Sequence, residues 1–264
     1  MKDLILSHLP ASYPWQGNLY YFPTIDSTNT QAKRMAAEGA PHGTVLIADS
    51  QTGGRGRMGR SFHSPAGTGI YMSMLLRPNC PAADLMHLTC AVAVAAADGV
   101  ETATGLRPKI KWTNDLVVGR KKLGGILTEL SLDSSGNVDY AVIGIGINCN
   151  QDAADFPDDI KQIATSLRLS TGKPTDRAVV IAQILAALQK MSENLQNSAA
   201  VLCRYRADCI TIGQEISLVR GEEIRHGKAL DVDSTGGLVV AFSDGHTETV
   251  QSGEVSVRGM YGYV

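Results

Sequence analysis

The chain has 264 residues, a formal net charge of −2, 44% hydrophobic residues and 19% charged residues. These values indicate a folded chain with a hydrophobic core, exclude a disordered polymer, and disfavour a protein that binds nucleic acid through a broad basic surface. The five cysteines show neither CxxC spacing nor an even count, which disfavours a structural zinc site and a disulfide framework. No secretory signal is visible, and the longest apolar run, Ala91–Ala97, is too short to span a bilayer, so we expect a reduced, cytoplasmic protein.

The first part of the chain alternates short strands with helices and contains one long loop. In chain order, we expect a strand at Leu19–Phe22, a helix from Asp26 to about Glu38, strands at Thr44–Ala48 and Ile70–Leu76, and a helix at Ala83–Thr104. Between the second and third strands, Ser50–Gly67 is rich in Gly, Arg and Ser and has almost no hydrophobic period. It is predicted to be a long loop, and loops of this length in compact domains are commonly functional or disordered.

The second part of the chain begins with β-rich sequence and ends with a change of composition. We expect neighbouring strands at Ile110–Val118 and Leu123–Leu132 around a Gly119-Arg120 turn, a hairpin turn at Asp133–Asn137, a strand at Tyr140–Ile147, and helices near Asp176–Leu195 and Ser198–Asp208. From Thr211 onward, glycines separate short alternating segments at Glu215–Val219, Ala229–Val232, Leu238–Phe242 and Thr247–Val250. This pattern predicts an α/β domain of about 210 residues followed by a small antiparallel barrel or sandwich.

The segment Gly53–Arg60 reads Gly-Gly-Arg-Gly-Arg-Met-Gly-Arg. Its glycines let the backbone approach a ligand, consecutive amides can bind an anion, and the arginines supply charge and bidentate donors. The segment lacks the Lys-Ser or Lys-Thr end of a P-loop and the following helix of a dinucleotide site. A flexible surface loop or a loose RNA contact is also compatible with this segment, although the net charge and the absence of interleaved aromatic residues weigh against RNA.

Four further segments carry polar residues at the ends of predicted elements. Ile25–Asn29 clusters hydroxyl and amide groups that can bind a small polar ligand or simply cap a helix. Lys111–Asp115 combines a cation, an aromatic ring, an amide and a carboxylate, or forms an edge strand with a buried Trp. Lys122–Leu127 places a lysine before two glycines, and Gly144–Asn148 ends a strand with small residues that permit close approach to the backbone.

Together and in this order, the five segments resemble the biotin–protein ligase family, also called biotin–[acetyl-CoA-carboxylase] ligase. The resemblance is dense over Phe22–Asn148 and weaker beyond. It implies an α/β (α+β) catalytic domain at 1–211, with a mixed or antiparallel sheet flanked by helices, and a small C-terminal SH3-like β-barrel domain at 212–264. The chain departs from the family pattern at Met58, at Phe62, where Trp is usual, and at Thr113, where Pro is usual.

The resemblance implies a reaction in two steps, in which biotin and ATP form biotinyl-5′-AMP and a carrier lysine then takes the biotinyl group. The first step needs positive charge and no base, because a carboxylate is already ionised at pH 7. The second step needs a lysine that has lost a proton, and Asp115 is the candidate that orients or deprotonates it. The implied catalytic residues are Arg55, Arg57, Lys122 and Asp115. Mg²⁺ is expected on the ATP phosphates, with no protein metal site.

The resemblance also assigns the substrate contacts. The implied biotin-binding residues are Ser27, Thr28, Asn29, Gln51, Gly54, Arg55, Gly56, Arg57, Lys122, Gly124, Gly125 and Ile126. The implied adenylate-binding residues are Arg57, Arg60, Phe62, Lys111, Trp112, Asn114 and Asn148. The glycine-rich loop is expected to be mobile without ligand and to order over the adenylate.

The implied partner is the biotin carboxyl carrier domain of an acetyl-CoA or pyruvate carboxylase. Only about 20 residues precede the first motif, too few for the winged-helix DNA-binding domain that many family members carry, so we expect no DNA binding. No membrane partner is expected, and the chain could be a monomer or a homodimer. Two alternatives stay open: an acyl-adenylate transferase of the lipoate–protein ligase type, and a protein that binds biotin or nucleotide without turnover.

Overall fold

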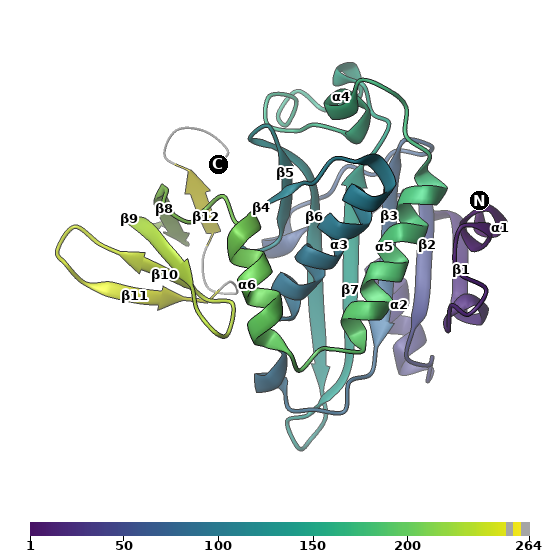
Figure 1. Cartoon of the computed structure of the whole chain (residues 1–264), viewed down its shortest axis with the longest axis horizontal. Helices are drawn as coiled ribbons and strands as arrows, with labels where there is room; N and C mark the ends of the chain where they lie inside the picture. The colour runs from purple at the N-terminus through teal and green to yellow at the C-terminus, as the bar shows by residue number, and fades with distance from the viewer. Residues whose placement is uncertain (252–255, 260–264) are drawn as a thin grey trace.

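The computed structural model describes residues 1–251 and 256–259, and its larger part is built on a seven-stranded sheet (Figure 1). The strands are β1 (Leu19–Ile25), β2 (Thr44–Gln51), β3 (Gly69–Leu76), β4 (Lys109–Lys111), β5 (Asp115–Val118), β6 (Lys121–Leu132) and β7 (Val138–Asn148). They lie in the order β1-β2-β3-β7-β6-β5-β4. Only β1 and β2 pair in parallel, so the sheet is mixed, as predicted.

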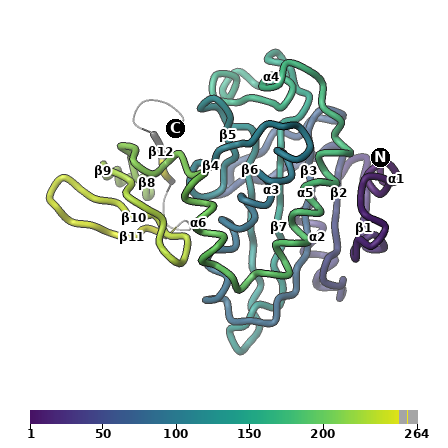
Figure 2. Tube along the Cα trace, viewed as in Figure 1, coloured from purple at the N-terminus to yellow at the C-terminus, as the bar shows by residue number. Residues whose placement is uncertain are grey.

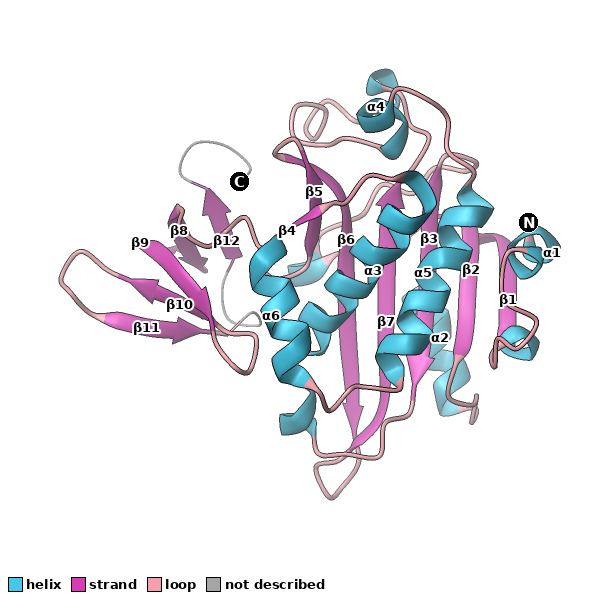
Figure 3. Ribbon diagram, in the orientation of Figure 1, coloured by secondary structure: helices cyan, strands magenta, loops and turns pink. Residues whose placement is uncertain are grey.

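Helices cover both faces of this sheet (Figure 3). They are α1 (Lys2–Ser7), α2 (Thr28–Ala37), α3 (Leu88–Thr104), α4 (Leu167–Thr171), α5 (Arg177–Ser192) and α6 (Ser198–Asp208). Four 3₁₀ turns are η1 (Gln16–Asn18), η2 (Arg57–Gly59), η3 (Ala82–Leu85) and η4 (Ala153–Asp155). Helices α3, α5 and α6 lie on one face, and α2 packs on β2, β3 and β7 from the other.

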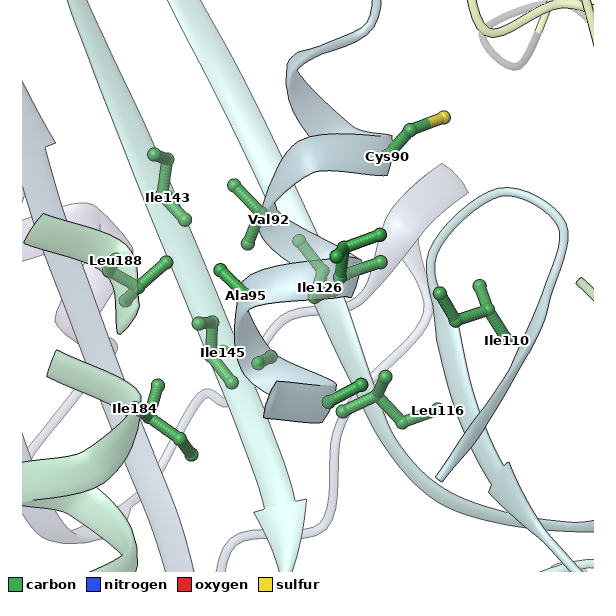
Figure 4. Close-up of a cluster of buried hydrophobic side chains, with 14 of the residues drawn as sticks. Cys90, Val92, Ala95, Ile110, Leu116, Ile126, Ile143, Ile145, Ile184 and Leu188 are labelled. Atoms are coloured by element: carbon green, nitrogen blue, oxygen red, sulfur yellow. The ribbon is translucent and has the colours of Figure 1, made fainter. Parts of the chain in front are cut away.

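The core lies between the sheet and helix α3, which is apolar on nearly every side. Figure 4 shows Val92 and Ala95 of α3 beside Ile143 and Ile145 of β7, with Ile184 of α5 close by. By length and composition the stretch Ala82–Thr104 could cross a membrane, but most of it is buried inside the protein. Because a core helix has the same composition, this burial accounts for the hydrophobicity of α3.

The structure corrects one predicted strand and moves the start of one predicted helix. The predicted strand Ile110–Val118 is two strands, β4 and β5, which turn back on each other so that Lys111 pairs with Asp115. Partners distant in sequence hold this turn: Trp112 N donates to Thr211 Oγ1 at 2.9 Å, and Tyr205 Oη donates to the carbonyl of Thr113 at 3.0 Å. The helix predicted from residue 83 begins at residue 88, after the 3₁₀ turn η3.

The C-terminal part forms a second, antiparallel sheet, as expected from its alternating segments. Its strands are β8 (Glu215–Arg220), β9 (Glu223–Val232), β10 (Leu238–Ala241), β11 (Thr247–Val250) and β12 (Ser256–Gly259). Their order is β11-β10-β9-β8-β12, and within the described residues the two edge strands β11 and β12 do not pair. Residues 252–255 and 260–264 of the predicted C-terminal domain lie outside the described part.

The two sheets lie next to each other, with α6 between them in the chain (Figure 2). Trp112 Nε1 donates to the carbonyl of Gly236 at 2.9 Å, and Arg206 Nε donates to the carbonyl of Val232 at 2.7 Å. Arg206 also forms an ion pair with Asp231. We propose that the domain boundary expected after residue 211 falls in the short connection between α6 and β8.

Candidate active site

A cavity of about 530 Å³ opens on the α2 side of the large sheet, a volume typical of small-molecule sites. Its walls come from the start of α2, the loop Gly53–Arg60, strands β6 and β7, and the segment 156–164. All of the site residues expected from the sequence line it except Gly54 and Gly124. Segments that are far apart in the chain therefore meet in one cavity.

The two exceptions are glycines that allow backbone segments to pack closely. A Cβ atom on Gly54 would lie 2.4 Å from the carbonyl oxygen of Phe62, and one on Gly124 would lie 2.4 Å from that of Gly146. Gly146 itself lets the ring of Phe62 lie over β7, since a Cβ there would meet the ring at 2.7 Å. Because these glycines lack a side chain, the neighbouring backbone and the Phe62 ring can pack closely at the walls of the cavity.

A bulge in β6 aims Lys122 into the cavity. Leu116 pairs with Gly124 but Val117 pairs with Lys122, so Leu123 is an extra residue without a partner on β5. Leu123 is fully buried in the core. In a regular strand, Lys122 and Gly125 would point to opposite faces, because they are three positions apart and side chains alternate. With the bulge, both residues line the cavity.

At one end of the cavity, Lys122 and Arg57 supply positive charge. Lys122 Nζ lies 2.7 Å from Asp115 Oδ1, and Arg57 Nη1 donates to Asn114 Oδ1 at 2.8 Å. Asn114 in turn donates to the carbonyl of Ile126 at 3.0 Å. Burial lowers the pKa of the Arg57 guanidinium, an effect that the nearby Asp115 opposes, and Arg remains charged throughout the ordinary pH range. We call this set of four side chains, Arg57, Asn114, Asp115 and Lys122, the cationic end.

The opposite end is a buried hydrogen-bond network in which each donor and acceptor can be assigned. Asn29 Nδ2 donates to the carbonyl of Leu127 at 3.2 Å and to Glu129 Oε2 at 2.9 Å, so its Oδ1 faces Ser73. Ser73, which is fully buried, donates its single proton to this Oδ1 at 2.6 Å. The hydroxyl of Thr28 lies 2.7 Å from Ser73 Oγ and 3.1 Å from Gln51 Oε1.

This network decides what Thr28 offers to a ligand. Gln51 Oε1 accepts from the backbone N–H of Thr28 at 2.9 Å, and Gln51 Nε2 donates to Ser64 Oγ at 3.1 Å, which fixes the Gln51 amide. The Thr28 hydroxyl donates to Gln51 Oε1 at 3.1 Å, so its proton is directed inside the protein. Thr28 presents lone pairs alone to the cavity, so it accepts from a ligand N–H.

Ser27 beside it has the opposite capacity. Its side chain makes no capping bond to α2, and no protein group among the described residues bonds its Oγ, which lines the cavity. Ser27 can therefore donate to a ligand carbonyl. We call Ser27, Thr28, Asn29, Gln51 and Ser73 the polar end.

The sequence had not singled out Glu129, Lys33 or Ser73. Glu129 Oε1 lies 2.7 Å from Lys33 Nζ and 3.5 Å from Arg55 Nη1. Burial raises the pKa of the Glu129 carboxyl, but hydrogen bonds from Lys33 and Asn29 lower it overall. The one signal in the sequence is spacing: Gly125, Leu127 and Glu129 alternate and so share a strand face.

The expected nucleotide contacts lie around the cavity, but several are already held by protein groups. Trp112 is buried and bound to Gly236, and Asn148 Nδ2 donates to the carbonyl of Thr165 at 3.0 Å. Phe62 meets Tyr71 edge to face at 6.3 Å between ring centres. Lys111 is buried, and Arg60 lines the cavity from the loop. These residues therefore serve mainly as walls of the cavity, because most of them are buried or packed against other protein groups.

An apolar wall that sequence reasoning missed closes this side. Phe156, Ile160, Ile163 and Ala164 line the cavity from the segment after β7. The backbone of Lys122 holds this segment, since Lys122 N donates to the carbonyl of Ile163 at 2.7 Å and its carbonyl accepts from Thr165 N at 2.8 Å. Val257 of β12 adds an apolar contact from the second sheet.

Comparison with known proteins agrees with this geometry. Residues 21–148 match the Biotin/lipoate A/B protein ligase family, and residues 211–258 match the Biotin protein ligase C terminal domain. The chain is 39% identical over 230 residues to the Bifunctional ligase/repressor BirA of Bacillus subtilis, covering 86% of this chain and 70% of that protein. It is 33% identical to the Biotin--[acetyl-CoA-carboxylase] ligase of Mycobacterium tuberculosis, covering 87% and 85%.

The chain belongs to the biotin protein ligase family. Among solved structures, the biotin protein ligase from Aquifex aeolicus in complex with biotin and ATP matches 92% of this chain and 99% of its own, with a TM-score of 0.77 and 32% identity. The fold, the enzyme class and the use of biotin and ATP expected from the sequence are confirmed by these matches.

Proposed function

We propose that this ligase joins biotin to AMP with ATP and then passes the biotinyl group to a lysine of a carrier protein. The observation that carries the proposal is that one cavity holds a neutral polar end and a cationic end. The two ends match a ligand that is neutral at one tip and becomes an acyl phosphate at the other. A cavity of about 530 Å³ has room for such a ligand.

The polar end favours biotin over a lipoyl group. A cyclic urea places N–H donors beside a carbonyl, which matches Thr28 as acceptor and Ser27 as donor. A dithiolane ring has neither group, so it would leave both hydroxyls without ligand partners. Sites built to hydrogen-bond a substrate reject analogues that lack the partner, because desolvated polar groups are costly.

The cationic end suits the first step, in which a carboxylate attacks a phosphate. The obstacle is the repulsion between two anions, and preorganised positive charge lowers it without a base. We assign this task to Lys122 and Arg57. Their partners, Asp115 and Asn114, keep the two cations in place before substrate arrives.

Asp115 has a restricted role in the second step. Its carboxylate lies 2.7 Å from the Lys122 ammonium and forms an ion pair with it. We assign Asp115 the task of holding Lys122 and attracting the carrier lysine, with the proton leaving to solvent. Lys122 then stabilises the oxygen charge that develops as the amine attacks the acyl carbonyl.

Magnesium fits this site as a companion of the nucleotide. Asp115 is the one carboxylate that lines the cavity among the described residues, and it is paired with Lys122. No cluster of three metal-ligating side chains exists in the described part of the chain. Since Mg²⁺ commonly binds through substrate phosphates and water, we place it on ATP.

For the partner, we propose the biotin carboxyl carrier domain of an acetyl-CoA or pyruvate carboxylase.

A cytoplasmic location is supported by the five cysteines, all of which are free, four of them buried. Proteins of reducing compartments keep their thiols in this state.

Transfer to a carrier tests the proposed function. The protein is incubated with Mg-ATP, a carrier domain and either biotin or lipoate, and the mass of the carrier is measured. We expect the mass of one biotinyl group on a single lysine, and none from lipoate. Binding of biotin without adenylate formation would instead identify a protein that does not turn over, and transfer from lipoate would refute the assignment of the polar end.

A further inference from the structure

The carboxylate of Glu129 lies on the cavity face of β6 and gathers three partners. Lys33 Nζ and Asn29 Nδ2 approach it at 2.7 and 2.9 Å, and Arg55 Nη1 of the glycine-rich loop lies 3.5 Å away. The Glu129 side chain is 22% exposed and the Arg55 side chain is 47% exposed. Lys33 and Asn29 therefore hold the Glu129 carboxylate in place, while the more exposed Arg55 side chain can leave it and return.

This contact holds the Arg55 side chain at a part of β6 away from Lys122. Glu129 and Lys122 are seven positions apart on β6, which corresponds to roughly 20 Å at the rise of an extended strand. A guanidinium held at Glu129 is therefore directed toward the polar end, where Asn29 bonds the same carboxylate.

The two arginines of the loop also bind to different walls. Arg57 Nη1 donates to Asn114 at the β4–β5 turn, while Arg55 meets Glu129 on β6. The base of the loop is tied separately, because Gly53 N donates to the carbonyl of Asp26 and Phe62 N donates to that of Gly54. The loop consequently crosses the cavity with one arginine anchored on each side.

We propose that Glu129 is a positioning residue that holds the glycine-rich loop over bound ligand through Arg55. In this assignment Arg55 retains the adenylate, and Arg57 supplies charge at the reacting end. The inference rests on the proposed function, since it concerns the same adenylate. It assigns Arg55 a positioning role, where the family resemblance suggested a charge-stabilising one.

The test measures how fast synthetic biotinyl-5′-AMP leaves the purified protein after dilution into excess biotin. Glu129→Gln keeps an oxygen that can accept from Asn29 and removes the charge. We expect release to be about two- to fivefold faster, the range of a partly exposed ion pair, with the difference shrinking at high salt. Arg55→Met should have the same effect, and the double variant should be no faster than either single one.

Lys33→Met is the matched control, because it removes the other cation from the same carboxylate and leaves Arg55 its partner. We expect its release rate to stay at the wild-type value. Wild-type release from Glu129→Gln, or additive effects in the double variant, would overturn the inference. Because the adenylate is supplied, this result is independent of turnover: failure of the wild-type protein to form adenylate from biotin and ATP would refute the proposed function instead.

Discussion

Replacing Thr28 by Val tests the assignment of the polar end. Val has nearly the same shape as Thr and lacks the hydroxyl. The protein itself loses little, because Ser73 keeps its bond to Asn29 and Gln51 keeps the backbone N–H of Thr28. A bound urea would lose the acceptor for one N–H.

The size of the effect follows from that unpaired donor. Leaving one buried donor without a partner costs about 1–3 kcal/mol, which is roughly a 5- to 150-fold increase in the Kd for biotin. Titration calorimetry measures it directly. The affinity for ATP should stay unchanged, since Thr28 lies at the end of the cavity opposite Lys122.

Thr128→Val is the matched control. Thr128 lies on β6, but its hydroxyl bonds Thr89 of α3 at 3.2 Å, on the other side of the sheet from the cavity. We expect its biotin affinity to match that of the wild-type protein. A Thr28→Val protein that also binds biotin within twofold of wild type would show that the hydroxyl does not accept from the ligand and would refute the reasoning.

Three further predictions concern charge, packing and a buried hydroxyl. Lys122→Met should slow biotin-dependent pyrophosphate exchange by about 10²–10³-fold. Lys121→Met, a change at the exposed neighbouring lysine, should leave the rate unchanged. Equal rates in both variants would contradict the role of Lys122. Gly99→Ala should lower the free energy of unfolding, measured by urea titration, by about 1–3 kcal/mol, because its Cβ would lie 2.5 Å from the Cα of Ile184. An unchanged unfolding midpoint would show that α3 and α5 can separate at little cost. Thr113→Val should raise the unfolding free energy by about 1 kcal/mol, since Thr113 Oγ1 is buried without a hydrogen-bond partner. A decrease would show that this hydroxyl does have a hydrogen-bond partner.

Much of the fold could be read from local sequence. Strands β2, β3, β6 and β7 and helices α3, α5 and α6 appear near their predicted positions, because hydrophobic periodicity is a property of neighbouring residues. The motifs were also local, since each is a few residues at an element's end. The split of Ile110–Val118 into β4 and β5 was not predictable in this way, because its turn is held by Thr211 and Tyr205.

The site divides along the same line. The sequence motifs predicted most of the polar and charged residues that line the cavity, but not its apolar wall of Phe156, Ile160, Ile163 and Ala164. The tertiary structure alone decided their directions: the unpaired Leu123 turns Lys122 inward, Gln51 accepts the Thr28 proton, and Glu129 pairs with Arg55. Strand register and the direction of a hydrogen bond depend on partners from distant parts of the chain. The order of residues along the chain does not by itself show which of these distant residues pair.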